Sequence, residues 1–109
     1  MAATKFNASV SVDGNGILTL KLGKVFPEFQ RGEDPNSYFY ISFHETIAGK
    51  KFELPGFDIG WSQVRLEQKN ETTFTCALPS NYLVTLAGRQ FSVKVEVETD
   101  GPGDYEAWT

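Results

Sequence analysis

The chain has 109 residues, which is a common size for one domain, and we predict a single domain over residues 1–109. Its hydrophobic content of 40% and charged content of 22% are ordinary for a globular protein and exclude wholesale disorder. The net charge is -4 and no basic run occurs, so we expect no nucleic-acid partner.

The first 22 residues predict a β-hairpin. Apolar and polar residues alternate from Lys5 to Val12 and again from Ile17 to Leu22, as on strands with one buried face. Between them stands Asp13-Gly14-Asn15-Gly16, which contains both Asp-Gly and Asn-Gly, two signals of a tight hairpin turn. The segment Gly23–Pro35, with two prolines and two glycines, is expected to be a loop.

The next predicted strand, Ser37–Phe43, is aromatic on both faces. Apolar residues occupy every second position from Phe39 to Phe43, and Tyr38 and Tyr40 fall on the opposite side. An exposed face seldom carries two tyrosines. We therefore expect Tyr38 and Tyr40 either to pack under a loop or a dimer partner, or to line a ligand surface. A homodimer is the simplest partner that would cover them.

The rest of the chain contains further short strands separated by turns. We expect strands at Lys51–Leu54, Trp61–Glu67, Thr72–Leu78, Gln90–Glu98 and Tyr105–Trp108, and either a strand or one helical turn at Leu83–Leu86. The clearest is Gln90–Glu98, where alternation predicts that four residues face the core: Phe91, Val93, Val95 and Val97. In Thr72–Leu78 the inward residues are expected to be Phe74, Cys76 and Leu78.

Seven or eight short strands with no convincing helix are typical of an all-β protein. We predict an immunoglobulin-like or fibronectin type III-like β-sandwich of antiparallel strands. A small barrel is the alternative.

No motif in the sequence indicates catalysis. Cys76 is the only cysteine, so neither an internal disulfide nor a thiolate zinc site is available, and its apolar neighbours favour a buried position. His44-Glu45 is interpreted as a surface pair, and the carboxylates lack calcium-loop spacing. We expect no enzyme activity, no cofactor and no metal. We also expect no membrane insertion and no signal peptide, and therefore a cytoplasmic location or release by a non-classical route.

Several aromatic residues fall near predicted strand ends or loops: Phe29, Tyr40, Trp61, Tyr82, Tyr105 and Trp108. Flat rings beside polar turns suit β-sandwich modules that stack on sugars, and they also seal dimers. The alternative is that these rings fill the ends of the core.

The chain resembles the fungal immunomodulatory proteins at several short motifs in the same order. Arg31-Gly32-Glu33-Asp34-Pro35-Asn36-Ser37-Tyr38 is similar to their W-G-R-G-x-P-N/S-N/S-F/Y segment. The other similar segments are Gly16–Leu22, Gly56–Gly60, Gln90–Val97, Asp100-Gly101 and the closing Ala107-Trp108.

This resemblance implies a fibronectin type III-like dimer that binds carbohydrate without catalysis and stimulates lymphocytes, with glycans or cell-surface glycoproteins as partners. The sugar site that it implies includes Phe29, Glu33 or Asp34, Gln90, Phe91 and Trp108, and Tyr40 is a further candidate from its exposed ring. Two features depart from the family. The N-terminal segment predicts a hairpin in place of a dimerising helix, and Phe29 and Gln90 stand where the family has Trp and Thr.

Overall fold

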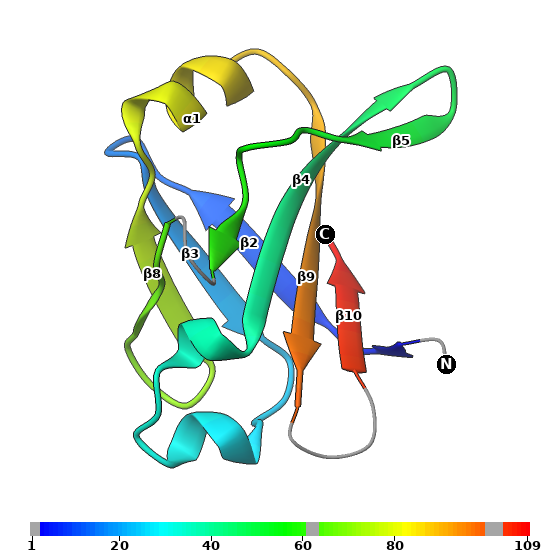
Figure 1. Ribbon diagram of the computed structural model, residues 1–109. Helices are drawn as coiled ribbons and strands as arrows, with labels where there is room; N and C mark the ends of the chain where they lie inside the picture. The colour runs from blue at the N-terminus through cyan, green and yellow to red at the C-terminus, as the bar shows by residue number, and fades with distance from the viewer. Residues whose placement is uncertain (1–2, 61–63, 100–103) are drawn as a thin grey trace.

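The computed structural model describes residues 3–60, 64–99 and 104–109, which form two β-sheets around one core (Figure 1). We call the six-stranded sheet, ordered β1-β10-β9-β4-β5 with β6 also paired to β4, the front sheet. The back sheet is ordered β2-β3-β8-β7. The strands are β1 (Thr4–Lys5), β2 (Ala8–Val12), β3 (Ile17–Leu22), β4 (Phe39–Ile47), β5 (Lys50–Glu53), β6 (Ile59–Gly60), β7 (Glu67–Gln68), β8 (Thr73–Ala77), β9 (Phe91–Glu98) and β10 (Asp104–Trp108).

The predicted N-terminal hairpin is confirmed as β2–β3. Its turn is held by Asp13, whose carbonyl accepts from the Gly16 N–H at 3.1 Å and whose Oδ1 accepts from the Asn15 and Ile17 N–H groups. Gly16 has a φ of 77°, a left-handed conformation that glycine adopts at little cost. Asp13-Gly14-Asn15-Gly16 therefore closes the hairpin with its second glycine in the left-handed position.

The core lies between the facing sides of the two sheets, as the alternation predicts. On β9, Val93, Val95 and Val97 are buried, and Phe91 is half-buried against the same core. The register places them beside the inward-facing residues of β4, the neighbouring strand in the same sheet. The back sheet supplies the predicted inward residues of β3 and β8, all buried: Leu18, Leu20, Leu22, Phe74 and Cys76, with Leu78 just beyond β8.

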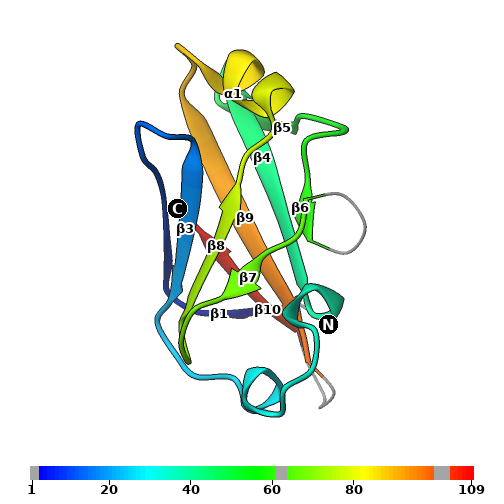
Figure 2. The same cartoon turned by 90° about the vertical axis from the view of Figure 1, so that its left-hand side faces the viewer.

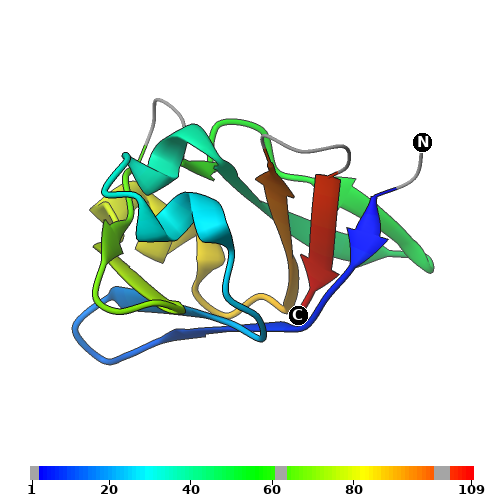
Figure 3. The ribbon, with the colours of Figure 1, turned by 90° about the horizontal axis from the view of Figure 1, so that it is seen from below.

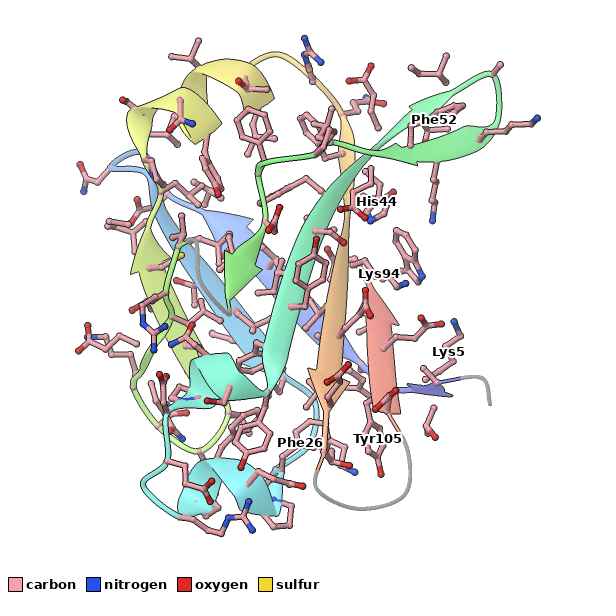
Figure 4. The ribbon with its side chains drawn as sticks, in the orientation of Figure 1. Lys5, Phe26, His44, Phe52, Lys94 and Tyr105 are labelled. Carbon is pink, nitrogen blue, oxygen red and sulfur yellow. The ribbon has the colours of Figure 1, made fainter. Side chains whose placement is uncertain are left out.

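An aromatic cluster fills the lower end of the sandwich, where the predicted loop folds into two short 3-10 helices, η1 (Pro27–Gln30) and η2 (Pro35–Ser37). Phe29 stacks on Phe39 with ring centroids 4.7 Å apart, and Phe26 meets Tyr105 edge-on at 5.1 Å. Figure 4 shows Phe26 and Tyr105 together at this end. The buried Asn36 side chain anchors η2 because it both donates to and accepts from the Leu66 backbone.

One helix was not expected. α1 (Ser80–Leu86) covers the upper end of the sandwich (Figure 2), so the prediction of no helix is wrong and the helical alternative for Leu83–Leu86 is the correct one. Tyr82 is buried and Leu86 packs against the core. A spacing of four residues places both side chains on one helical face. Four apolar-rich residues were too short a stretch for this period to be recognised from sequence.

The strand count also differs from the seven or eight antiparallel strands expected. The described residues contain ten strands, three of them only two residues long, and β1 pairs with β10 in parallel. The segment Lys5–Val12, expected to be one strand, is divided between the sheets. β1 lies at the edge of the front sheet and the chain then crosses to β2 (Figure 3). Trp61, with the start of its predicted strand, and the turn that includes Asp100-Gly101 lie outside the described residues.

Candidate functional site

The outward face of the front sheet carries an exposed ring among charged and hydroxyl groups. Successive side chains on a strand point to opposite faces, so the register fixes which residues share this face. Trp108 of β10 pairs with Lys94 of β9, which pairs with Ser42 of β4. Nine outward-facing residues of β4, β5, β9 and β10 form what we call the Trp108 cluster: Tyr40, Ser42, His44, Lys51, Glu53, Lys94, Glu96, Glu106 and Trp108.

Trp108 is the centre of this cluster. The Lys51 Nζ lies 4.0 Å from the centroid of its ring, the His44 ring meets it edge-on at 4.8 Å, and the Lys94 Nζ lies 5.7 Å from it. Figure 4 shows His44 and Lys94 on the same side of the sheet. These contacts orient the indole, yet 38% of the residue remains exposed. Part of the indole is therefore exposed to solvent, and the Lys51 ammonium lies over the ring.

Carboxylates and amines lie on the same face of the sheet as the ring. Lys94 bridges Glu96 and Glu106, with Nζ to carboxylate oxygen distances of 3.4 and 3.6 Å. Glu106 also forms an ion pair and hydrogen bond with Lys5 of β1, and this hydrogen bond is the main reason that the pKa of Glu106 is lowered. The face thus offers both hydrogen-bond donors and acceptors beside one aromatic surface.

Beneath the ring, Ser42 and His44 form a buried polar pair. The Ser42 Oγ lies 2.8 Å from the His44 Nε2. Burial lowers the pKa of His44 below its ordinary value of 6.5, and the charges of Lys94 and Lys51 lower it further while Glu53 opposes them. The spacing would suit a nucleophile and its base, but Ser42 is only 2% exposed and its hydroxyl is covered. The pair instead holds the imidazole against Trp108.

Tyr40 closes one side of the Trp108 cluster. Its hydroxyl donates to the Glu53 Oε2 at 3.1 Å, which ties β4 to the outward face of β5. Burial is the largest cause that raises the pKa of Tyr40 to about 12, followed by this hydrogen bond to a carboxylate and by the nearby negative charge of Asp58. Tyr40 is therefore a neutral donor over the physiological pH range.

The structure separates the site residues proposed from the sequence into different places. Tyr40 and Trp108 share the outward face of the front sheet. Phe29 is 3% exposed within the core, so its ring cannot stack on a sugar in this conformation. Glu33 and Asp34 lie in the loop at the lower end, where Glu33 accepts from the Tyr38 hydroxyl and Asp34 caps η2 and pairs with Arg65.

The proposed residues before and at the start of β9 also lie apart from Trp108. Gln90 is exposed just before β9, and Phe91 points to the opposite face of the sheet, where it meets Phe43 edge-on. The structure therefore does not bring Phe29, Gln90, Phe91 and Trp108 together in one place. Chain neighbours in a strand point to opposite faces, and Phe29 is needed to fill the lower end of the core.

Of the six aromatic residues expected near strand ends, the structure describes five, and three of these pack in or against the core. Phe29 and Tyr82 are buried, and Tyr105 packs partly against Phe26 and Phe6. Tyr38 is buried by its own loop, since its ring meets Phe29 and its hydroxyl bonds to Glu33 and Arg31. The loop alternative for Tyr38 is thus the correct one.

Sequence reasoning missed most of the Trp108 cluster. His44 is buried and not part of a surface pair with Glu45, because the two side chains point to opposite faces of β4. Ser42 and His44 stand two and four residues after Tyr40, and this period of two was the available signal. That Trp108, Lys51 and Glu53 complete the face depends on strand order, which no local pattern contains.

Within the described residues, no group of three or more His, Cys, Asp or Glu side chains is placed to hold a metal ion. The same residues include no helix long and apolar enough to cross a membrane. No protein-family model matches the chain, and no curated protein or solved structure matches it either.

Proposed function

We propose that the protein is a non-catalytic, lectin-like carbohydrate-binding module that binds sugars on the Trp108 cluster. The observation that carries this proposal is the partly exposed Trp108 ring on a sheet face whose other cluster members are polar. The apolar C–H face of a pyranose stacks on an indole, and its hydroxyls act as both donors and acceptors.

The groups around the ring suit this chemistry. Lys51 and Lys94 offer donors next to the Trp108 ring, and Glu96 and Glu106 offer acceptors beside Lys94. Lys51 is exposed, so its flexible side chain can change rotamer, leave the Trp108 ring and donate to a sugar hydroxyl. Ser42 and His44 fix the ring from below.

The fold type belongs to the same proposal. The sheet orders β2-β3-β8-β7 and β10-β9-β4-β5 correspond to the A-B-E-D and G-F-C arrangement of immunoglobulin-like sandwiches, with β5 as an added strand. A kinship with the fungal immunomodulatory proteins, and with it an action on lymphocytes, is part of the proposal too. It rests on the short sequence motifs and on Ala107-Trp108 in particular.

A glycan array probed with the labelled protein tests the proposal. Reproducible binding to a set of related sugars is expected for the wild type, and Trp108→Ala is expected to lose it at a temperature at which the variant remains folded. Ser42→Ala is expected to keep most of the binding, because the Ser42 hydroxyl does not reach the sugar. An array without reproducible signals contradicts the proposal.

The second candidate is a structural or interaction subunit, such as a phage or viral scaffold component, that has no small ligand. The β4–β5 hairpin favours it, because Ile47 and Phe52 are respectively 54% and 50% exposed there. Figure 1 shows this hairpin projecting from the body of the sandwich. A blank array together with a stable oligomer would support this candidate over the lectin-like one.

A further inference from the structure

A cavity of about 340 Å³ opens between the two sheets beside α1, on the opposite side of the front sheet from the Trp108 cluster. It is lined by Val10 and Val12 of β2, by Phe91 and Val93 of β9, and by neighbouring side chains of β4 and α1. Of its ten lining residues only Ser11 has a polar side chain, and none is charged. The lining of the cavity is therefore apolar, although 22% of the residues of the chain are charged.

The topology explains why the sandwich is open here. β2 is the edge strand of the back sheet. β10 pairs with β9 from Glu98 only as far as Lys94. Among the described strands, Phe91 and Ser92 therefore pair with β4 only and have no strand on their other side. The two sheets thus leave a gap between β2 and the start of β9, and α1 covers it from above.

The shape of the cavity favours a small molecule over a second protein. Its floor is made by buried side chains, those of Phe43, Leu78 and Val93, whereas the exposed Val12 and Leu83 form its rim. A protein surface would contact the rim and leave the floor unfilled. A stable protein interface also covers about 800 Å² on each partner, far more than such an opening.

We propose that this cavity is a second binding site, specific for a small uncharged apolar molecule of the size of naphthalene or of a chain of about ten carbons. A dry apolar cavity of about 150 Å³ accommodates benzene, and this one is about twice as large. A charged ligand would lose its hydration without finding a partner, since no charged side chain lines the cavity.

The test is a fluorescence titration of the full chain with N-phenyl-1-naphthylamine, a neutral probe whose emission rises in apolar surroundings, and with naphthalene as competitor. Ala87→Trp places an indole at the mouth of the cavity from a position that is exposed. Val84→Trp adds the same ring on α1 at a residue that is 77% exposed and does not line the cavity, so it is the matched control. Thermal midpoints establish that both variants fold.

The proposal expects saturable binding of one probe per chain, displacement by naphthalene, and at least a tenfold loss of affinity in Ala87→Trp but not in Val84→Trp. The absence of saturable binding to the wild type would overturn it, as would equal binding by both variants. A concentration-dependent dimer that dissociates on probe binding and in Ala87→Trp would assign the cavity to a second copy, and this would overturn it too.

Discussion

Trp108 is the residue on which the functional proposal depends, and its contacts separate a binding role from an anchoring role. The ring is partly exposed and packs against His44 and Lys51. We predict that Trp108→Ala lowers the affinity for a soluble oligosaccharide at least tenfold, or about 1.4 kcal/mol, because the stacking surface is lost. Stability should fall by about 2 kcal/mol, since more than half of the residue is buried. Isothermal titration calorimetry and thermal unfolding give the two numbers.

Phe52→Ser is the matched control for Trp108→Ala. Phe52 is the other strongly exposed ring of the front sheet, and its side chain points away from the face that carries Lys51 and Glu53. Its removal should leave the affinity per site unchanged. If Trp108→Ala loses affinity only in proportion to a large loss of stability, Trp108 is an anchor of the last strand and not part of a site.

His44 makes the stability of the fold sensitive to pH. Burial lowers its folded-state pKa below 6.5, so the unfolded chain binds a proton before the folded one as the pH falls. The neutral imidazole therefore contributes stability that is complete above about pH 6.5 and is lost as the pH drops below that value. Thermal midpoints from pH 7.5 to 5.5 should decrease for the wild type and decrease less for His44→Gln. Parallel curves for the two proteins would show that another group titrates.

At the scale of elements, β9 is the strand around which the front sheet is built. Val95 lies at its centre, fully buried. We predict that Val95→Asp destabilises the protein by about 4 kcal/mol or more, because it buries a charge without a partner, and this would unfold most domains of this size. Val84→Asp, at an exposed position of α1, should change the unfolding free energy by about 0.5 kcal/mol or less. A Val95→Asp protein with an unchanged urea midpoint would contradict the position of β9.

The elements that alternation specifies could be predicted from the sequence. Val93, Val95 and Val97 lie on the predicted face, and the β2–β3 hairpin follows its turn residues. The helix α1 could not be predicted with confidence, since its seven residues give less than two full helical periods of pattern. The crossing of the N-terminal segment from one sheet to the other could not be predicted either. The alternation of apolar and polar residues continues unbroken from Phe6 to Val10, so the sequence shows no break between the two strands.

The candidate site was less predictable than the fold for a physical reason. Trp108 and Tyr40 were recognised as aromatic residues near strand ends. Their polar neighbours Lys51 and Lys94 come from β5 and β9, and only the pairing of these strands with β4 and β10 brings them together. The sequence resemblance implies Phe29 and Glu33 as site residues, whereas in the structure Phe29 is buried in the core at the lower end.

At the scale of the whole molecule, we predict a homodimer whose contact is formed by the β4–β5 hairpin and not by Tyr38 and Tyr40. Tyr38 is covered by its own loop, so no second protomer is needed to bury its ring. Ile47 and Phe52 on the projecting hairpin are the larger exposed apolar residues. Light scattering at micromolar protein should give twice the monomer mass of 12.1 kDa, and Ile47→Lys should return the protein to a monomer. A wild-type monomer at this concentration would contradict the prediction.

The most direct test of sugar binding on the outward face is to observe the Trp108 ring itself. The chain has two tryptophans, so Trp61→Phe leaves Trp108 as the only indole emitter. This variant is titrated with a soluble form of the glycan that gives the strongest array signal. The expected result is a saturable change in the wavelength or intensity of Trp108 emission, with a midpoint equal to the dissociation constant from calorimetry. Calorimetric binding with unchanged Trp108 emission, or no binding of any glycan, would contradict the proposal.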